Sequence, residues 1–292
     1  MKGHGAAWGA ISFVNALATG VGAAAAISLS AHARVEHTRV ARGAGTIEIE
    51  TDHDTPLVRG SLLGALRRFE PAGSFNVRLR VHSLIPPARG LKSSSAVSVA
   101  IVRAVAASLH REITPIESAF FASDVGRATG LSATGGLDDA LASACGGIVV
   151  ADCLGRRRLR HDRADPDWRA VLWVPTTPHP PSPEWLTGFR AHSSEGQAAV
   201  DAARDGRYLA AMARNTELVE KVMRYDYRAL RLELHRRGAL AAGVSGMGPT
   251  IAAIVPARNG SAVSRALPAG NRSVMIAEFV PPGREPSESG VS

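Results

Sequence analysis

The chain has 292 residues, of which 45% are hydrophobic and 21% charged, a composition typical of a soluble globular protein. It excludes a disordered chain, a collagen-like chain and a multi-pass membrane protein, and the length predicts one large or two modest domains. The net charge is +8, and 31 of the 34 basic residues are arginine, which indicates a genome-wide codon bias or an anionic partner. Two cysteines, Cys145 and Cys153, are too few for a disulfide framework and suit a reducing cytoplasm.

The first thirty residues allow two interpretations. Lys2, an Ala/Gly-rich stretch and the sequence AHA at 31–33 together resemble a secretory signal with its cleavage site. The longest apolar block, residues 23–27, is too short to cross a bilayer. We therefore favour a buried segment whose small residues let backbones approach closely. The alternative is export, with a mature N-terminus near Arg34.

The middle of the chain predicts a strand followed by helices. Residues 75–82 alternate apolar and polar side chains, as in a half-buried strand, and PPARG at 86–90 ends it. Residues 93–109 have a helical apolar pattern. A capping box at residues 114–117 predicts a helix that ends near residue 130. A short helix at 138–144 and a strand at 148–151 follow.

A change of composition at residues 155–167 and a proline-rich stretch at 175–183 predict a domain boundary. The arginines at 156–158 indicate a solvated hairpin tip, with an anion site as the lesser interpretation. The elements predicted beyond the boundary are helices near 195–204, 207–223 and 226–237 and strands near 250–255 and 273–280. The last dozen residues are expected to be disordered.

The segment IPPARGLKSSSAV, from Ile85 to Val97, joins the strand to the long helix. A helix start with unpaired N–H groups, hydroxyls and a lysine is suited to bind anions, above all a phosphate chain with its metal ion. Plain N-capping by one serine is the alternative. The segment is not a Walker loop, because Leu91 separates Gly90 from Lys92 and no glycine lies five residues before Gly90.

Two further segments carry unusual glycines or acids. AGVSGMGPT at 242–250 has three glycines in six positions, which indicates positive φ or a close backbone contact. TGGLDDA at 134–140 places two carboxylates at a helix start after a flexible turn. An N-cap with an acid favoured by the helix dipole explains this second segment equally well.

Taken together and in this order, the three segments resemble the motifs of the GHMP kinase superfamily over about residues 5–280. NALATGVGAAAAISL, RGLKSSSA and TGGLDDA are most similar to archaeal-type shikimate kinases. The early lysine pattern of galacto- and mevalonate kinases is absent. The resemblance implies an α+β, two-layer α/β fold. It places a ribosomal protein S5 domain 2-like ATP-binding half at 1–155, a ferredoxin-like half at 156–280 and a tail at 281–292.

The resemblance also implies ATP and Mg²⁺ as cofactors and the shikimate 3-hydroxyl as acceptor. Asp138 would accept or orient the hydroxyl proton, Asp139 would support it, Ser95 would bind Mg²⁺, and Asp124 is a candidate second metal ligand. The expected phosphate-binding residues are Pro87, Arg89, Gly90, Leu91, Lys92, Ser93, Ser94 and Ser95. The expected substrate and glycine-loop residues are Asn15, Thr19, Gly243, Ser245, Gly246 and Gly248.

Two rival functions stay open at this point. One is a homoserine kinase or another GHMP-type alcohol kinase. The other is a basic nucleic-acid-binding protein with an S5-like fold, against which scattered arginines and 5% aromatic residues argue. We expect a cytoplasmic enzyme without nucleic-acid or membrane partners, and a homodimer is left open.

Overall fold

The small-residue segment at the N-terminus forms the two longest of the described strands. β1 (Lys2–Val14) and β2 (Val21–Arg39) pair antiparallel across a turn at residues 15–20. Most of their residues are buried on both faces, which removes the alternation that marks a half-buried strand. The interpretation as a buried segment is confirmed, and the segment is β-structure.

The computed structural model describes all of the chain except residues 41–44, 52–53, 177–182, 269–271 and 288–292. In this part, six strands form an N-terminal sheet in the order β3-β4-β2-β5-β6, and β1 also pairs with β2. β3 and β4 are parallel, whereas the other pairs are antiparallel. The remaining strands are β3 (Ile47–Glu50), β4 (Phe75–Ser83), β5 (Ile148–Asp152) and β6 (Arg157–Asp162).

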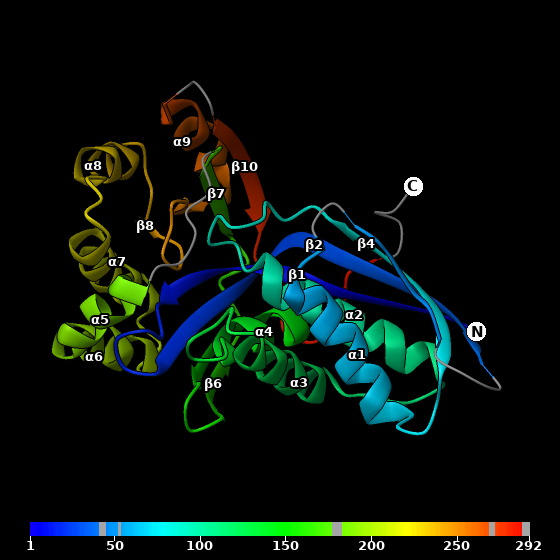
Figure 1. Cartoon of the computed structure of the whole chain (residues 1–292). Coiled ribbons are helices and arrows are strands. Elements are labelled where there is room, and N and C mark those ends of the chain that lie inside the picture. The colour runs from blue at the N-terminus through cyan, green and yellow to red at the C-terminus, as the bar shows by residue number, and fades with distance from the viewer. Residues whose placement is uncertain (41–44, 52–53, 177–182, 269–271, 288–292) are drawn as a thin grey trace.

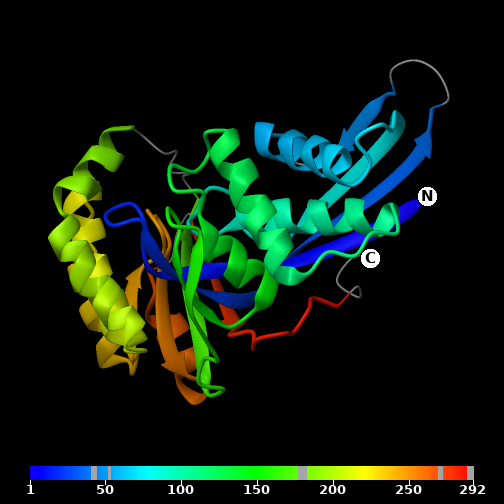
Figure 2. The ribbon, with the colours of Figure 1, turned by 90° about the horizontal axis from the view of Figure 1, so that it is seen from below.

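Four helices gather on one side of this sheet (Figures 1 and 2). The second of them packs directly on β1 and β2. Gly5 of β1 permits this approach, because a Cβ there would lie 2.2 Å from the carbonyl oxygen of Ala100. The helices are α1 (Pro56–Phe69), α2 (Ser93–Ser108), α3 (Pro115–Ala128) and α4 (Leu137–Cys145).

The C-terminal half is built on a second, four-stranded sheet in the order β10-β7-β9-β8. Counted from β7, this is the strand order 4-1-3-2, which agrees with the expected ferredoxin-like arrangement. Its strands are β7 (Trp168–Pro175), β8 (Ala241–Val244), β9 (Ile251–Pro256) and β10 (Arg272–Glu278). Its helices are α5 (Pro183–Ala191), α6 (Ser193–Arg204), α7 (Tyr208–Met223), α8 (Arg228–Arg236), the 3-10 turn η1 (Ala257–Asn259) and α9 (Gly260–Ala266).

The two halves share one apolar core. Its largest cluster combines Phe13 of β1, Ala199 of α6 and Ile254 of β9. At the tip of the β1–β2 hairpin, the Asn15 backbone N–H donates to Oδ1 of Asn215 on α7 at 2.8 Å. The hairpin therefore carries N-terminal residues into the C-terminal half (Figure 1).

The elements predicted from periodicity are confirmed, with ends shifted by at most about three residues. They are β4, α2, α3, α4, β5, α6, α7, α8, β9 and β10. The capping box is present, since Thr114 Oγ1 accepts from the Glu117 N–H and Glu117 accepts from the Thr114 N–H. Of the three arginines expected at a hairpin tip, Arg156 lies in the β5–β6 turn, whereas Arg157 and Arg158 begin β6.

Two boundaries differ from the predictions. The break expected at 155/156 falls inside the β5–β6 hairpin, and the change of sheet comes after Asp162. The tail expected to be disordered is placed as far as residue 287: the Trp8 indole donates to the Arg284 carbonyl at 2.7 Å, and the Gly283 N–H donates to the Cys145 carbonyl at 2.8 Å. Residues 288–292 and most of the proline-rich stretch lie outside the described part. None of the described helices has both the length and the apolar character to span a bilayer.

Candidate active site

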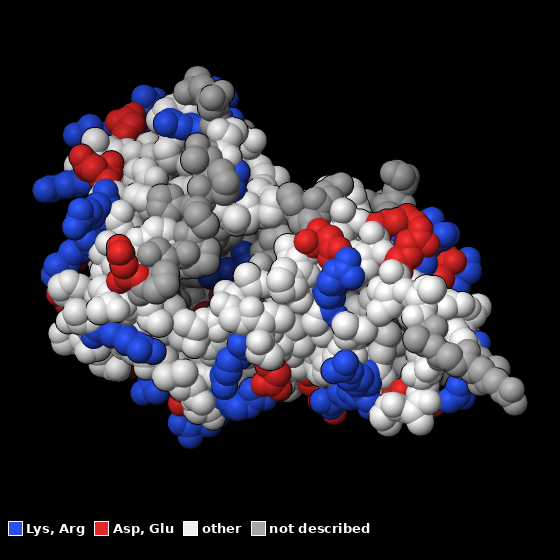
Figure 3. Space-filling view, in the orientation of Figure 1, with Lys and Arg blue, Asp and Glu red and all other residues white. Residues whose placement is uncertain are grey.

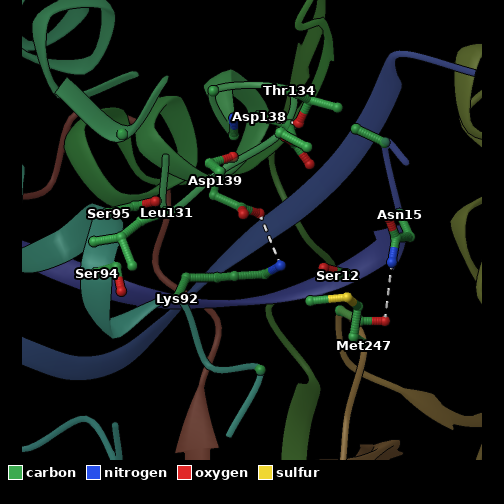
Figure 4. A pocket seen from close by; sticks show the side chains of 18 of the residues that line it. Ser12, Asn15, Lys92, Ser94, Ser95, Leu131, Thr134, Asp138, Asp139 and Met247 are labelled. Carbon is green, nitrogen blue, oxygen red and sulfur yellow. Dashed lines mark hydrogen bonds and ion pairs between the residues drawn. The ribbon is translucent and has the colours of Figure 1, made fainter. Parts of the chain in front are cut away.

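A cavity of about 530 Å³ lies where the tip of the β1–β2 hairpin, the starts of α2 and α4, and the turn after β8 meet. Figure 4 shows side chains from these segments facing one another, and the face in Figure 3 is hollowed near its centre. All three segments singled out in the sequence contribute to it. The lining residues with polar or charged side chains are Ser12, Asn15, Arg89, Lys92, Ser93, Ser94, Ser95, Ser132, Thr134, Asp138 and Asp139.

The start of α2 is open toward this cavity. Its N-cap residue is Lys92, in the left-handed conformation with φ 63°, and no side chain caps the helix. The first N–H that bonds back to Lys92 is that of Ala96, so the N–H groups of residues 93–95 precede the intrahelical ladder. The N-capping explanation of the serines is therefore wrong, and three hydroxyls and three N–H groups remain for an anion.

The start of α4 faces the same cavity. Gly136 is its N-cap, with φ 58° and no side-chain cap, so Asp138 and Asp139 do not cap it either. The Nζ of Lys92 lies 3.1 Å from Oδ1 of Asp139, and both side chains are less than one-fifth exposed. Figure 4 shows this pair bridging the two helix starts. Lys92 of the serine segment is thus paired with the second aspartate of the acidic segment, next to Asp138.

Asp138 is the most deeply buried charged group of the cavity, with 3% of its surface exposed. Burial, and next the neighbouring Asp139 carboxylate, raise the pKa of Asp138 to about 7, although Lys92 and a hydrogen bond from the Cys153 thiol oppose the shift. A carboxylate with this pKa is a stronger base than an ordinary aspartate and is still partly ionised at neutral pH.

Ser245 of the glycine loop connects β1 with the serine segment. Its Oγ accepts a hydrogen bond from the Ser12 N–H at 3.0 Å and donates one to the Gly90 carbonyl at 2.7 Å. The side chain is fully buried, and its two hydrogen bonds hold β1 and the serine segment against the glycine loop.

We expect Ser245→Ala to raise KM for the nucleotide about 10-fold and to lower Tm. The substitution removes the partner of the buried Ser12 N–H and of the partly buried Gly90 carbonyl, at a cost of about 1–3 kcal/mol. Steady-state kinetics and thermal denaturation measure both effects. Ser143→Ala is the matched control, because Ser143 is equally buried and its Oγ has no partner. Equal effects of the two substitutions would contradict a role for the Ser245 hydrogen bonds in holding these segments together.

The structure brings most of the predicted site residues together. Those that line the cavity are Asn15, Arg89, Gly90, Leu91, Lys92, Ser93, Ser94, Ser95, Gly246, Asp138 and Asp139. Arg89 lines it with a guanidinium that donates to the backbone carbonyls of Pro87, Ala88, Pro175 and Thr176. This arginine therefore fastens the serine segment to the end of β7, and we do not carry it forward as a phosphate ligand.

Other predicted residues do not line the cavity. Thr19 hydrogen-bonds the backbone of Val21, and the Asp124 carboxylate pairs with Arg156. The structure gives Asp124 no place in the site, so we do not retain it as a metal ligand. Pro87, Gly243 and Gly248 also lie outside the lining residues.

Several site residues were missed in the sequence. Ser12 lines the cavity, is 1% exposed and has an Oγ without a hydrogen-bond partner. Its signal was faint: one hydroxyl in an otherwise apolar run. Leu186 of α5 and Met247 add apolar walls, and Cys153 lies behind Asp138. These four come from distant parts of the chain, so only the fold relates them.

The comparisons with known proteins agree with this site. Residues 57–147 match the family model described as the GHMP kinases N terminal domain. The shikimate kinase of Methanothrix thermoacetophila is 34% identical over 266 residues, which cover 91% of this chain and 90% of that protein. The shikimate kinase of Pyrococcus abyssi is 34% identical over 260 residues, covering 87% and 92%.

Solved structures show the same fold at low identity. A mevalonate kinase crystal structure matches with a TM-score of 0.73 at 13% identity, covering 96% of this chain and 99% of that one. A phosphotransferase related to the CoA biosynthesis pathway matches with a TM-score of 0.75 at 15% identity, covering 96% and 97%. The expected fold class is confirmed, and the chain belongs to the shikimate kinases of the GHMP kinase superfamily.

Proposed function

We propose that this protein transfers the γ-phosphoryl group of ATP to the 3-hydroxyl of shikimate. The observation that carries the proposal is that two uncapped helix starts, a lysine and a buried, basic carboxylate surround one cavity. Phosphoryl transfer requires positioning and charge neutralisation above all, and this arrangement can supply both.

The nucleotide phosphates would lie against the start of α2. The N–H groups and hydroxyls of residues 93–95 would bind phosphate oxygens, and Lys92 would offset the charge that develops during transfer. Asp138 would accept the hydroxyl proton as the substrate oxygen attacks the γ-phosphorus and ADP departs. Because the proton leaves late in a loose transition state, this role requires a well-placed, ionised carboxylate rather than a strongly basic one.

The acceptor would occupy the side of the cavity formed by the hairpin tip and the glycine loop. Asn15 is held there by donation from its Nδ2 to the Gly246 carbonyl at 3.3 Å. The unpaired Ser12 hydroxyl and Thr134 offer partners for substrate hydroxyls, and Leu186 and Met247 offer apolar surface for the ring.

Magnesium fits this site as a companion of the nucleotide. No group of three or more His, Cys, Asp or Glu side chains in the described ranges could hold a metal by itself. Mg²⁺ commonly binds through substrate phosphates with few protein oxygens, and the Ser95 hydroxyl in the open first turn of α2 would provide one. When bound, the ion neutralises phosphate charge.

We expect kcat/KM for shikimate to exceed that for homoserine, mevalonate and galactose by about 100-fold or more. A site whose polar groups are placed for the hydroxyls of one substrate rejects a ligand that leaves those polar groups unpaired. A coupled assay of ADP release over these four alcohols measures this. A higher kcat/KM for another alcohol would support phosphotransferase activity but would contradict shikimate as the acceptor.

We also propose a cytoplasmic location, which the two buried free thiols favour. On the face in Figure 3, basic side chains are interspersed with acidic ones rather than gathered in one stripe. Some of the arginines form ion pairs, such as Arg80 with Glu50 and Arg231 with Glu220.

A further inference from the structure

We propose that Cys153 is a positioning residue for Asp138, and that its thiol fixes the rotation of the carboxylate by donating a hydrogen bond to one of its oxygens. This inference deepens the proposed function and rests on it for the role of Asp138. Cys153 follows β5 directly and does not line the cavity, so it acts through the aspartate.

The geometry holds the carboxylate from two sides. The Cys153 Sγ lies 3.1 Å from Oδ1 of Asp138, whereas its other acceptor, the Ala151 carbonyl, is 3.9 Å away. On the other side is Gly22 of β2, where a Cβ would lie only 2.2 Å from Oδ2. The carboxylate is thus held between the thiol and the bare backbone of β2.

The backbone around Cys153 is itself fixed. Its N–H donates to the Gly20 carbonyl at 2.8 Å. Its carbonyl accepts at 3.1 Å from Nη2 of Arg127 on α3, which also donates to the Thr134 carbonyl at 3.2 Å. These hydrogen bonds fix the position of the Cys153 thiol relative to the start of α4.

The sulfur must carry its proton to play this part. Cys153 is fully buried, and burial together with the Asp138 charge raises the pKa of its thiol well above the usual range. A neutral S–H is a weak donor. It can orient a carboxylate while removing less of its basicity than a hydroxyl or amide donor would.

The other charged groups around Asp138 are few. Asp139 stands next to it on α4, Lys92 faces it from the start of α2, and Arg127 reaches the neighbouring carbonyls from α3. β2 contributes Gly22, which has no side chain. A change at Cys153 therefore alters one hydrogen bond and no formal charge.

The first test compares Cys153→Ala, Cys153→Ser and Cys145→Ala in the full chain. We expect Cys153→Ala to lower kcat about 10-fold with KM for ATP and shikimate within twofold of wild type, and to move the acid limb of kcat/KM to higher pH. Cys153→Ser should restore kcat and move the limb below that of wild type, because a hydroxyl is the stronger donor. Cys145 is the control, as the second buried thiol and one without a contact to Asp138.

The second test detects the hydrogen bond of the Cys153 thiol by infrared spectroscopy and does not depend on enzyme activity. In the Cys145→Ala protein, the remaining S–H infrared band should lie at the lower frequency of a hydrogen-bonded thiol and should rise in frequency when Asp138→Ala is added. An unchanged band would overturn the inference, as would a Cys153→Ala enzyme with wild-type kcat and pH profile. A wild-type enzyme that does not phosphorylate shikimate would instead reject the proposed function, and the infrared band would still decide the hydrogen bond.

Discussion

Asp138→Asn should lower kcat by roughly 10³-fold while the affinity for ATP stays within a few-fold of wild type. General-base assistance contributes about 10²–10⁴ in rate, and an amide cannot accept the hydroxyl proton. The proposed nucleotide contacts lie at the start of α2 and do not include Asp138. Rapid-quench measurement of phosphoryl transfer and calorimetric titration of ATP separate the two effects.

Asp124→Asn is the matched control for this prediction, because the Asp124 carboxylate lies outside the cavity and pairs with Arg156. We expect it to keep wild-type turnover. An Asp138→Asn enzyme with turnover similar to that of Asp124→Asn would remove Asp138 from the mechanism.

Asp138→Asn should also stabilise the folded protein at alkaline pH. The pKa of Asp138 is raised to about 7 in the folded state, against about 4 in an unfolded chain, so the folded protein binds this proton more tightly. The contribution of protonated Asp138 to the unfolding free energy of the wild type is therefore lost progressively as pH rises from about 4 to about 7. Asp138→Asn avoids that loss, so its Tm should exceed that of wild type at pH 8, with a smaller gain at pH 5. An equal gain at both pH values would argue against the raised pKa.

Much of the fold could be predicted from local patterns. The alternation in 75–82 and the capping box at 114–117 were sufficient because each depends on neighbours in the sequence. The β1–β2 hairpin could not be identified as strands, since alanines such as Ala23 and Ala24 are buried on both faces and carry no periodicity. The exact place where the sheet changes, after Asp162, could not be found within residues 155–167, because the arginines of β6 resemble a linker until the sheet pairs them with β5.

The site was predictable where one segment contains the chemistry. The serine segment and the acidic pair are contiguous in sequence, and they do face each other. What the sequence could not reveal is whether the helix starts are capped, because that depends on the φ angles of Lys92 and Gly136. The roles of Ser12 and Cys153 were equally hidden, since a lone hydroxyl or thiol becomes informative only when its neighbours are known.

Gly22→Ala should reduce kcat about 100-fold, although Gly22 takes no part in the chemistry. Its new Cβ would lie 2.2 Å from Oδ2 and 2.5 Å from Cγ of Asp138. Gly22 pairs with Ala151 in the middle of the sheet, so the strand cannot easily retreat. Asp138 is the group that must move, and a displacement of about 1 Å can cost about 10² in rate. Pre-steady-state kinetics would show the loss in the transfer step.

A double-mutant cycle shows whether the effect acts through this carboxylate. In an Asp138→Ala background the obstacle is gone, so Gly22→Ala should cost much less unfolding free energy than it does in wild type, as measured by denaturant titration. Gly260→Ala serves as the control glycine, because a Cβ there meets only ordinary contacts at 3.8 and 3.9 Å from Ile276. If Gly22→Ala were equally costly in both backgrounds, β2 itself would be distorted, and the close approach of Asp138 to the strand would not explain why a glycine occupies this position.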